Sequence, residues 1–205
     1  MRSPQRFKPR SMQCGRPEAM ASEHPYTSEW ALRVGHTAEL GPDVLGRARQ
    51  LLEQVFEADW TESDWEHALG GVHVMAFSGD LLVGHGAVVQ RRLLYRGEAL
   101  RTGYVEAFGV HSAYRRAGVG GRMMDVLEGV IARAFELGAL SATDVAAEFY
   151  SKRGWLQWQG PLSALTPGGI RPTPEEAGGV YVLPGTRQLD IHDSLGADWR
   201  DGDVW

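Results

Sequence analysis

Cysteine is almost absent from this chain of 205 residues, and several other familiar features are missing as well. The single cysteine, Cys14, excludes a disulfide framework, and its polar N-terminal surroundings exclude a cysteine nucleophile in the folded part. No window approaches the ~18 apolar residues of a membrane span, and the N-terminus lacks the apolar core of a secretory signal. The seven histidines show no metal-ligand spacing. We therefore expect a cytoplasmic protein with no membrane partner and no metal.

Acidic residues outnumber basic ones, and the imbalance is uneven along the chain. Residues 1–19 hold five arginines and lysines against Glu18 alone, while the whole chain has a formal charge of −5, so residues 20–205 carry about −9. An acidic body repels nucleic acid and attracts small polycations. The segment 1–19 lacks periodicity and is expected to be a disordered basic tail. A nucleic-acid-binding arm is one interpretation, but an upstream start codon or an expression remnant is favoured, with a functional start near Met20.

Residues 20–205 suit a single domain of medium size with a well-buried core. Apolar periodicity predicts helices over residues 42–56, 61–69, 119–135 and 144–154. Alternation and turn residues predict strands over 29–34, 72–77, 81–95, 100–110, 139–143 and 178–184, and a Pro- and Gly-rich loop over 161–179. This order predicts an α+β, or mixed α/β, single domain.

The segment "GYVEAFGVHSAYRRAGVGGRMMDVLEGV" joins an expected strand to an expected helix through glycines. Glycines at a helix start let an anion approach free backbone N–H groups, and Arg115 and Arg116 add positive charge, so the pattern indicates a pyrophosphate cradle. It lacks the Gly-Lys-Ser/Thr of a P-loop. It also lacks the third glycine of the dinucleotide fingerprint, since Met123 stands there. A glycine-rich turn that only packs a helix on a sheet is the simpler alternative.

The string "RRAGVG" resembles the acyl-CoA signature Arg/Gln-x-x-Gly-x-Gly/Ala of the GNAT N-acetyltransferase superfamily. "FYSKRGW" downstream is similar to the second CoA-facing element of that family. The resemblance implies a mostly antiparallel central sheet flanked by helices, and acetyl-CoA as co-substrate. It places the cofactor on residues of the strand end and the helix start: Phe108, Gly109, Val110, Arg115, Arg116, Ala117, Gly118, Val119 and Gly120.

A narrower resemblance spans residues 30–205. The strings "ADWTESDWEH", "VVQRRLLYRGEALRTGYVE", "LGALS", "VYVLP" and "DWRDGDVW" are similar to aminoglycoside 2′-N-acetyltransferases, notably the mycobacterial type. That family transfers acetyl from acetyl-CoA to the 2′-amine of aminoglycoside antibiotics and so confers resistance. It is commonly dimeric, which leaves a homodimer open. Two departures stand out: a Glu175-Glu176 pair where Asp is typical, and Phe108 where Val is typical.

Amine acetylation needs a group that accepts a proton and a group that supplies one to the departing thiolate. Glu106 interrupts an apolar strand just before the cradle, and the resemblance gives it the role of remote base. The resemblance places Tyr150 as general acid. A solvent-facing carboxylate and a core tyrosine are the structural alternatives. Without a reactive cysteine or a Gly-x-Ser-x-Gly elbow, direct attack in a ternary complex is expected.

A cationic drug needs carboxylates along its length. The resemblance points to eight substrate contacts: Asp59, Glu106, Ala107, Ser141, Glu175, Glu176, Asp203 and Trp205. We expect the final segment to dock through Trp199 and Trp205 and to present Asp203 and an α-carboxylate of Trp205. Two other functions stay open: a GNAT enzyme acting on another amine, such as a cell-wall amino sugar or a protein lysine, and a non-catalytic acyl-CoA-binding module.

Overall fold

The computed structural model describes residues 29–205, so the expected tail 1–19 and a start at Met20 lie outside the described residues. The α-helices are α1 (Pro42–Phe56), α2 (Glu62–Ala68), α3 (Val119–Ala134) and α4 (Asp144–Ser151), and the short 3₁₀ turns are η1 (Thr37–Glu39), η2 (Glu57–Asp59), η3 (Ser112–Tyr114) and η4 (Pro174–Glu176). The strands are β1 (Ala31–His36), β2 (Val72–Ser78), β3 (Leu81–Tyr95), β4 (Glu98–Val110), β5 (Leu137–Ser141), β6 (Leu156–Gln157), β7 (Leu162–Thr166), β8 (Gly169–Pro172), β9 (Val180–Pro184) and β10 (Leu195–Ala197).

All ten strands form one curved sheet in the order β6-β9-β5-β4-β3-β10-β7-β8, with β2 joining β3 to β1. Neighbours are antiparallel except β4 with β5 and β10 with β7. The predicted mixed α/β fold with a mostly antiparallel sheet is confirmed.

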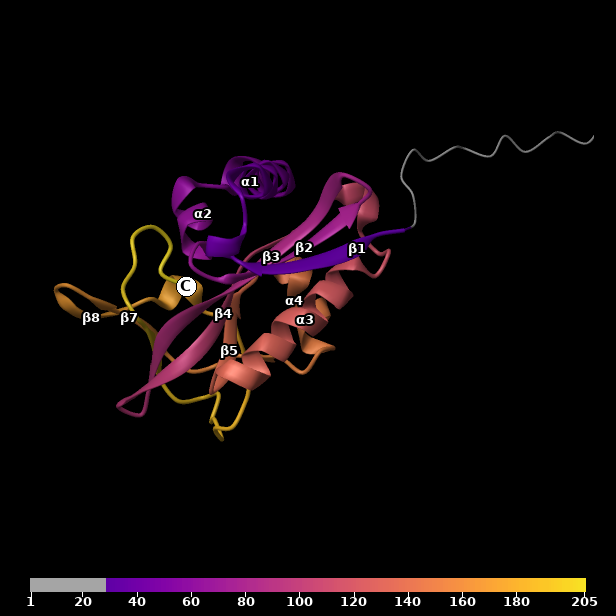
Figure 1. Ribbon diagram of the computed structural model, residues 1–205. Coiled ribbons are helices and arrows are strands. Elements are labelled where there is room, and N and C mark those ends of the chain that lie inside the picture. The colour runs from indigo at the N-terminus through magenta and orange to yellow at the C-terminus, as the bar shows by residue number, and fades with distance from the viewer. Residues whose placement is uncertain (1–28) are drawn as a thin grey trace, which may run out of the picture.

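Helices cover both faces of the sheet: α1 and α2 lie on one side, α3 and α4 on the other (Figure 1). Each helix is placed by its apolar stripe. Helix α3 buries Val119, Met123, Met124, Leu127 and Ile131 against β2, β3 and β4, and α1 buries Ala48, Leu51 and Leu52. Truncating a fully buried leucine in such a stripe costs about 2–5 kcal/mol, so these stripes fix the helices on the sheet.

The prediction of an irregular loop over residues 161–179 is wrong. That segment forms the antiparallel pair β7–β8 and then η4. Gly169, with φ of 114°, closes the hairpin, so the glycines that suggested a loop make a tight turn between strands. The two- and three-residue strands β6 and β10 were also unexpected, because so few residues show no alternation.

Strands β4 and β5 diverge in the middle of the sheet. They pair in parallel only from Thr102↔Leu137 to Tyr104↔Ala139, after which β4 continues alone on that edge to Val110. Near the same point β4 bulges on its other edge, because its pairing with β3 jumps from Glu106↔Ala87 to Gly109↔His85. The split and the bulge together open the sheet at its centre.

None of the helices within residues 29–205 is long and apolar enough to cross a bilayer.

Candidate active site

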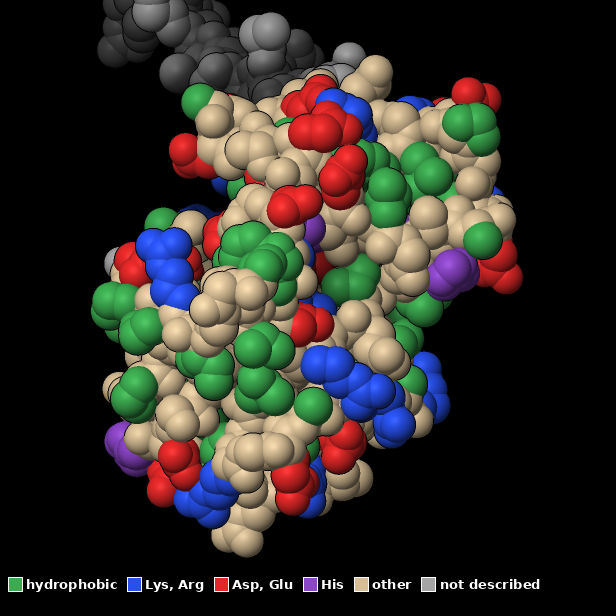
Figure 2. All heavy atoms as spheres, turned by 90° about the vertical axis from the view of Figure 1, so that its left-hand side faces the viewer, with side chains coloured by type: hydrophobic (Ala, Val, Ile, Leu, Met, Phe, Trp, Pro, Cys, Tyr) green, Lys and Arg blue, Asp and Glu red, His purple; other side chains and the backbone are tan. Residues whose placement is uncertain are grey.

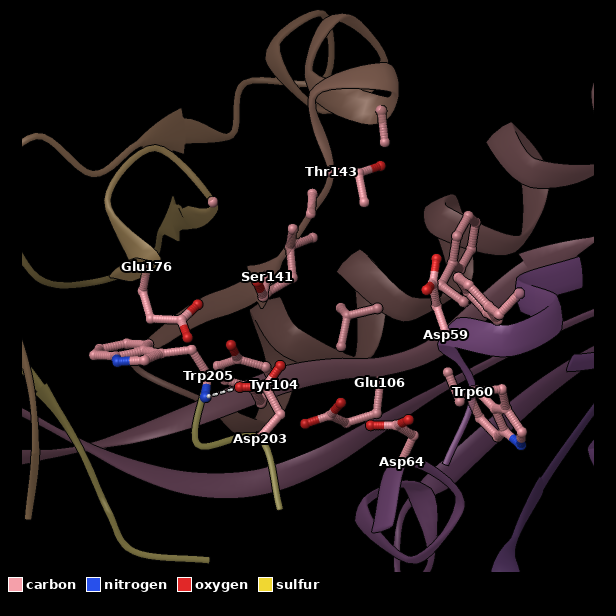
Figure 3. A pocket seen from close by; sticks show the side chains of 18 of the residues that line it. Asp59, Trp60, Asp64, Tyr104, Glu106, Ser141, Thr143, Glu176, Asp203 and Trp205 are labelled. Carbon is pink, nitrogen blue, oxygen red and sulfur yellow. Dashed lines mark hydrogen bonds between the residues drawn. The ribbon is translucent and has the colours of Figure 1, made fainter. Parts of the chain in front are cut away.

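A cleft of about 460 Å³ opens where β4 and β5 diverge. Its walls come from η2, the start of α2, the ends of β4 and β5, α4, η4 and the segment after β10 (Figure 3). Segments that are distant in the sequence therefore meet at one site.

Negative charge dominates the cleft. Among residues 29–205, six acidic side chains line it, against the single cation Arg200: Asp59, Asp64, Glu106, Glu175, Glu176 and Asp203. Red side chains gather around a hollow on the face in Figure 2. The pKa of Glu176 is raised, first by burial and then by the nearby charges of Asp203 and Glu175. Such a concentration of carboxylates favours a ligand that carries several positive charges. Within residues 29–205 no group of three or more His, Cys, Asp or Glu is arranged to hold a metal ion.

The structure brings all eight expected substrate residues to this cleft. They come from four regions: Asp59 from η2, Glu106 and Ala107 from β4, Ser141 from β5, and Glu175, Glu176, Asp203 and Trp205 from the C-terminal part. In Figure 3 the carboxylates of Asp59, Glu106, Glu176 and Asp203 border one shared space. Their roles toward a substrate stay predictions.

Glu106 is nearly buried and forms an ion pair with Arg200, whose Nη1 donates to its Oε1. The two side chains are only 12% and 14% exposed. Burial raises the pKa of Glu106, and the Arg200 guanidinium opposes this rise without cancelling it. A carboxyl with a raised pKa is a stronger base when ionised than an exposed glutamate. The alternative of a solvent-facing carboxylate is wrong.

Arg200 also fastens the C-terminal segment. Its Nε donates to the Asp203 carbonyl at 2.7 Å and its Nη2 to the main-chain oxygen of Trp205 at 2.9 Å. The Trp205 ring is buried, and its Nε1 donates to Thr173 Oγ1 at 2.9 Å. The expectation that Trp199 also docks is wrong, because this ring is 48% exposed. Trp205 and Arg200 therefore provide the anchorage that was expected of two tryptophans.

Tyr150 lines the same cleft from α4, with its ring against Phe149, Trp155 and Tyr181. It is 6% exposed, and burial raises the pKa of its phenol, which stays neutral at neutral pH. It can donate a hydrogen bond to a nearby anion. Complete proton transfer to a thiolate is uphill, because an ordinary thiol has a pKa of about 8.5.

Beside the cleft, the start of α3 offers an anion cradle. Gly118 caps the helix with φ of 83°, a left-handed conformation that glycine adopts without strain, and the cap makes no side-chain hydrogen bond. The first N–H groups of a helix lack intrahelical acceptors and face its positive end. Arg115, Arg116 and Ala117 are exposed around them. These residues fit the diphosphate of CoA by donor type and charge.

The end of β4 adjoins this cradle. A Cβ placed on Gly120 would lie 3.6 Å from Val110 and 3.8 Å from the Phe108 ring. Phe108 stacks on Phe149 at 6.2 Å and lines the cleft, so it links cradle and cleft. A Cβ placed on Gly109 would point toward α1 and lie within 3.2 Å of Val55 and Leu52. Gly109 can therefore contact a ligand only through its N–H and carbonyl groups.

Several lining residues were not predicted from the sequence, among them Trp60, Asp64, Tyr104 and Arg200. Tyr104 is buried, and the guanidinium carbons of Arg91 and Arg200 lie 4.7 and 5.5 Å from the centre of its ring. Its hydroxyl has no hydrogen-bond partner within residues 29–205. Only Asp64 had a local signal, as the last residue of the Thr61–Asp64 capping box.

Comparison with known proteins gives a consistent result. The acetyltransferase (GNAT) domain family matches residues 39–157. An aminoglycoside 2′-N-acetyltransferase of Mycolicibacterium fortuitum is 48% identical over 177 residues, which cover 84% of this chain and 91% of that protein.

Two solved structures from Escherichia coli share the fold at low sequence identity. ElaA superposes with a TM-score of 0.57 at 17% identity, over 76% of this chain and 99% of its own. The GNAT family N-acetyltransferase YhbS, solved in complex with CoA, gives a TM-score of 0.56 at 16% identity, over 82% of this chain and 89% of its own.

Proposed function

Because the chain belongs to the GNAT acetyltransferase family, within it to the relatives of the aminoglycoside 2′-N-acetyltransferases, we propose that it acetylates the 2′-amine of aminoglycoside antibiotics. Acetyl-CoA is the donor that GNAT enzymes use. The observation that carries the choice of acceptor is the cleft beside β4, where six carboxylates face one arginine. An aminoglycoside carries several ammonium groups on a rigid set of rings. The carboxylates of the cleft are likewise distributed over several of its walls.

Binding is electrostatic and distributed. Asp59 on one wall and Glu175, Glu176 and Asp203 on the opposite wall accept hydrogen bonds from ammonium groups of the drug. Charge-assisted hydrogen bonds of this kind contribute about 1.5–3 kcal/mol each.

Glu106 acts as the base. The 2′-ammonium must lose a proton before its nitrogen can attack, and Glu106 accepts that proton, directly or through a water molecule. Burial raises the pKa of Glu106 and so makes its carboxylate more basic, while the Arg200 guanidinium opposes this rise and favours the ionised form. The neutral amine then attacks the thioester carbonyl carbon in a ternary complex, and the C–S bond breaks with the electron pair leaving on sulfur.

Two features of the chain stabilise the reacting groups. Backbone N–H groups at residues 108–110 lie where β4 has left β5, and they are suited to hold the thioester carbonyl and the pantetheine arm. The neutral Tyr150 phenol donates a hydrogen bond to the departing thiolate, which lowers the barrier even where the proton is not fully transferred. The start of α3 holds the diphosphate.

The proposal is tested by regiochemistry. We expect CoA release from acetyl-CoA with tobramycin, which has a 2′-amine, and none above background with amikacin or kanamycin A, which have a 2′-hydroxyl. Equal rates on both kinds of drug would contradict the 2′ assignment. Turnover of a protein lysine or a cell-wall amino sugar in place of tobramycin would move the proposal to another acceptor.

A further inference from the structure

Two histidines that take no part in this mechanism lie end to end in the core behind the cleft. His73 on β2 and His85 on β3 are both 0% exposed, and His73 Nδ1 lies 2.9 Å from His85 Nε2. At one end, His85 Nδ1 lies 2.9 Å from the Ala107 carbonyl oxygen. At the other end, His73 Nε2 lies 2.7 Å from Thr37 Oγ1. The result is a continuous chain of hydrogen bonds from η1 to β4.

The hydrogen atoms in this chain can be assigned from its fixed end. The Ala107 carbonyl can only accept, so His85 Nδ1 carries the hydrogen. Burial lowers the pKa of both imidazoles to about 4, so both rings are neutral at neutral pH. Since His85 Nε2 must then accept, His73 Nδ1 carries a hydrogen, and His73 Nε2 accepts from the Thr37 hydroxyl.

The outer end closes the assignment. Thr37 Oγ1 accepts from the Gly70 N–H at 2.8 Å. Its own hydrogen has two acceptors in reach, and His73 Nε2 at 2.7 Å is closer than the Gly71 carbonyl oxygen at 3.3 Å. With Thr37 donating to the closer His73, the contacts from Thr37 to Ala107 all run in one direction. The arrangement permits one tautomer for each ring, and both tautomers are Nδ1–H.

This chain of hydrogen bonds ends at Ala107, the strained residue of the β4 bulge. Ala107 has φ of 51°, a left-handed conformation that is costly for any residue with a Cβ and persists only where its surroundings enforce it. Two residues of β4, Ala107 and Phe108, stand opposite Gly86 alone in the β3 pairing. The peptide that joins Ala107 and Phe108 therefore falls outside the regular strand pairing, and the His85 N–H donates a hydrogen bond to its carbonyl.

This peptide lies between the groups that perform the reaction. The peptide is trans, so the Phe108 N–H points opposite to the Ala107 carbonyl, away from the histidines. Glu106 precedes it by one residue, and Ala107 and Phe108 both line the cleft. A rotation of this one peptide plane would therefore redirect a backbone donor that lies next to Glu106.

We propose that His85, held in a single tautomer by His73 and Thr37, is a positioning residue that fixes the Ala107–Phe108 peptide plane for acyl transfer. The proposal rests on the proposed function for its kinetic readout, but not for its structural one. The Trp65 ring, 6.0 Å from His85, packs against this pair without offering a competing acceptor.

The test compares two substitutions at one site. His85→Leu removes the donor and fills the space, whereas His85→Asn keeps an amide N–H near the position of Nδ1. We expect His85→Leu to lower kcat roughly 10- to 100-fold, with KM for both substrates changed by less than about threefold, because a misplaced group impairs the chemical step. His85→Asn should recover most of kcat although its melting temperature falls as well. Thr37→Val leaves the rings in place and removes the outer hydroxyl, which donates to His73 and accepts from the Gly70 N–H, and it should give a smaller loss of kcat.

Nitrogen-15 NMR of the imidazoles supplies a readout that needs no drug. We expect Nδ1–H tautomers for both His73 and His85, and a shift of the Phe108 amide on adding CoA that disappears in Thr37→Val. Nε2–H tautomers, or His85→Asn no more active than a folded His85→Leu, would overturn the proposal. If His85→Leu does not fold, the tautomers and Thr37→Val decide. A wild-type enzyme that shows these NMR signatures but leaves tobramycin unmodified would contradict the proposed acceptor and not the positioning role.

Discussion

Replacing Arg200 by methionine should reveal two effects of its guanidinium on Glu106: it stabilises the buried carboxylate, and it lowers the pKa of that carboxyl group. The ion pair is shielded from solvent, with both side chains less than 15% exposed. Breaking such a pair leaves an uncompensated buried carboxylate and costs about 3–5 kcal/mol. The same substitution removes the largest force that lowers the pKa of Glu106 while burial, which raises it, remains.

The size of the expected pKa change follows from the kind of contact. An arginine in direct contact lowers a carboxyl pKa by about 1–3 units, so Arg200→Met should raise the pKa of Glu106 by that amount. A base works only when it is ionised. The acidic limb of kcat/KM for tobramycin should therefore move to higher pH by about 1–3 pH units.

The assay is CoA release with tobramycin across pH 5–9 in wild type, Arg200→Met and Arg153→Met. Arg153 pairs with Glu128 at 2.6 Å, with both side chains about one-fifth exposed, and neither lines the cleft. The control should lose comparable stability without moving the limb. Titration of the drug itself is common to all three profiles. An unmoved limb in Arg200→Met, or an equal movement in Arg153→Met, would refute the assignment of Glu106 as the base that Arg200 moderates.

Three further outcomes are expected. Tyr150→Phe should lower kcat at least tenfold at unchanged KM because the thiolate loses a hydrogen-bond donor, while Tyr181→Phe, a neighbouring ring 6.1 Å away that does not line the cleft, should change neither parameter. Asp203→Asn should raise KM for tobramycin by roughly 10- to 100-fold at constant kcat, and the exposed Asp201→Asn should leave KM unchanged; equal effects of the two would contradict a specific contact. Acid should destabilise the fold through His73 and His85. In the unfolded chain these imidazoles become protonated below pH 6.5, whereas in the folded chain they become protonated only near pH 4. The free energy of unfolding, from urea titrations, should thus fall by about 2.7 kcal/mol per pH unit over that window, and less steeply in His85→Asn; parallel slopes would contradict it.

Most of the fold was predictable because its elements carry strong local signals. Helix α1 begins at Pro42 and repeats apolar residues at helical spacing, and the long strands β3 and β4 alternate clearly. The error at β7 and β8 has a physical reason. This hairpin lies at the edge of the sheet, and β8 is exposed along its whole length, so neither its composition nor its alternation reflects burial.

Many residues of the cleft could be predicted from the sequence, but the bonds between them could not. Family resemblance identified Glu106, Tyr150 and the acidic walls, and the comparison with the 2′-N-acetyltransferase confirms that resemblance. Arg200 and the histidine pair could not be found in this way. Arg200 lies 94 positions from Glu106, and His73 lies 36 positions from Thr37 and on a different strand from His85. Only the folded chain brings these partners together, since no local pattern marks an ion pair or a hydrogen-bonded chain across a sheet.

Because the Arg200 guanidinium both holds the tail and pairs with Glu106, the proposed mechanism couples docking of the tail to ionisation of Glu106. When residues 198–205 lie on the sheet, Arg91 Nε holds Asp198 at 2.8 Å, and Arg200 reaches Glu106 and Trp205 together. If the segment detached, Glu106 would lose the guanidinium that opposes the burial-driven rise of its pKa. The Asp203 contact would be lost at the same time. Substrate binding and base strength thus depend on the same anchorage, so a tail that only filled space would not reproduce the site even if its tryptophan were kept.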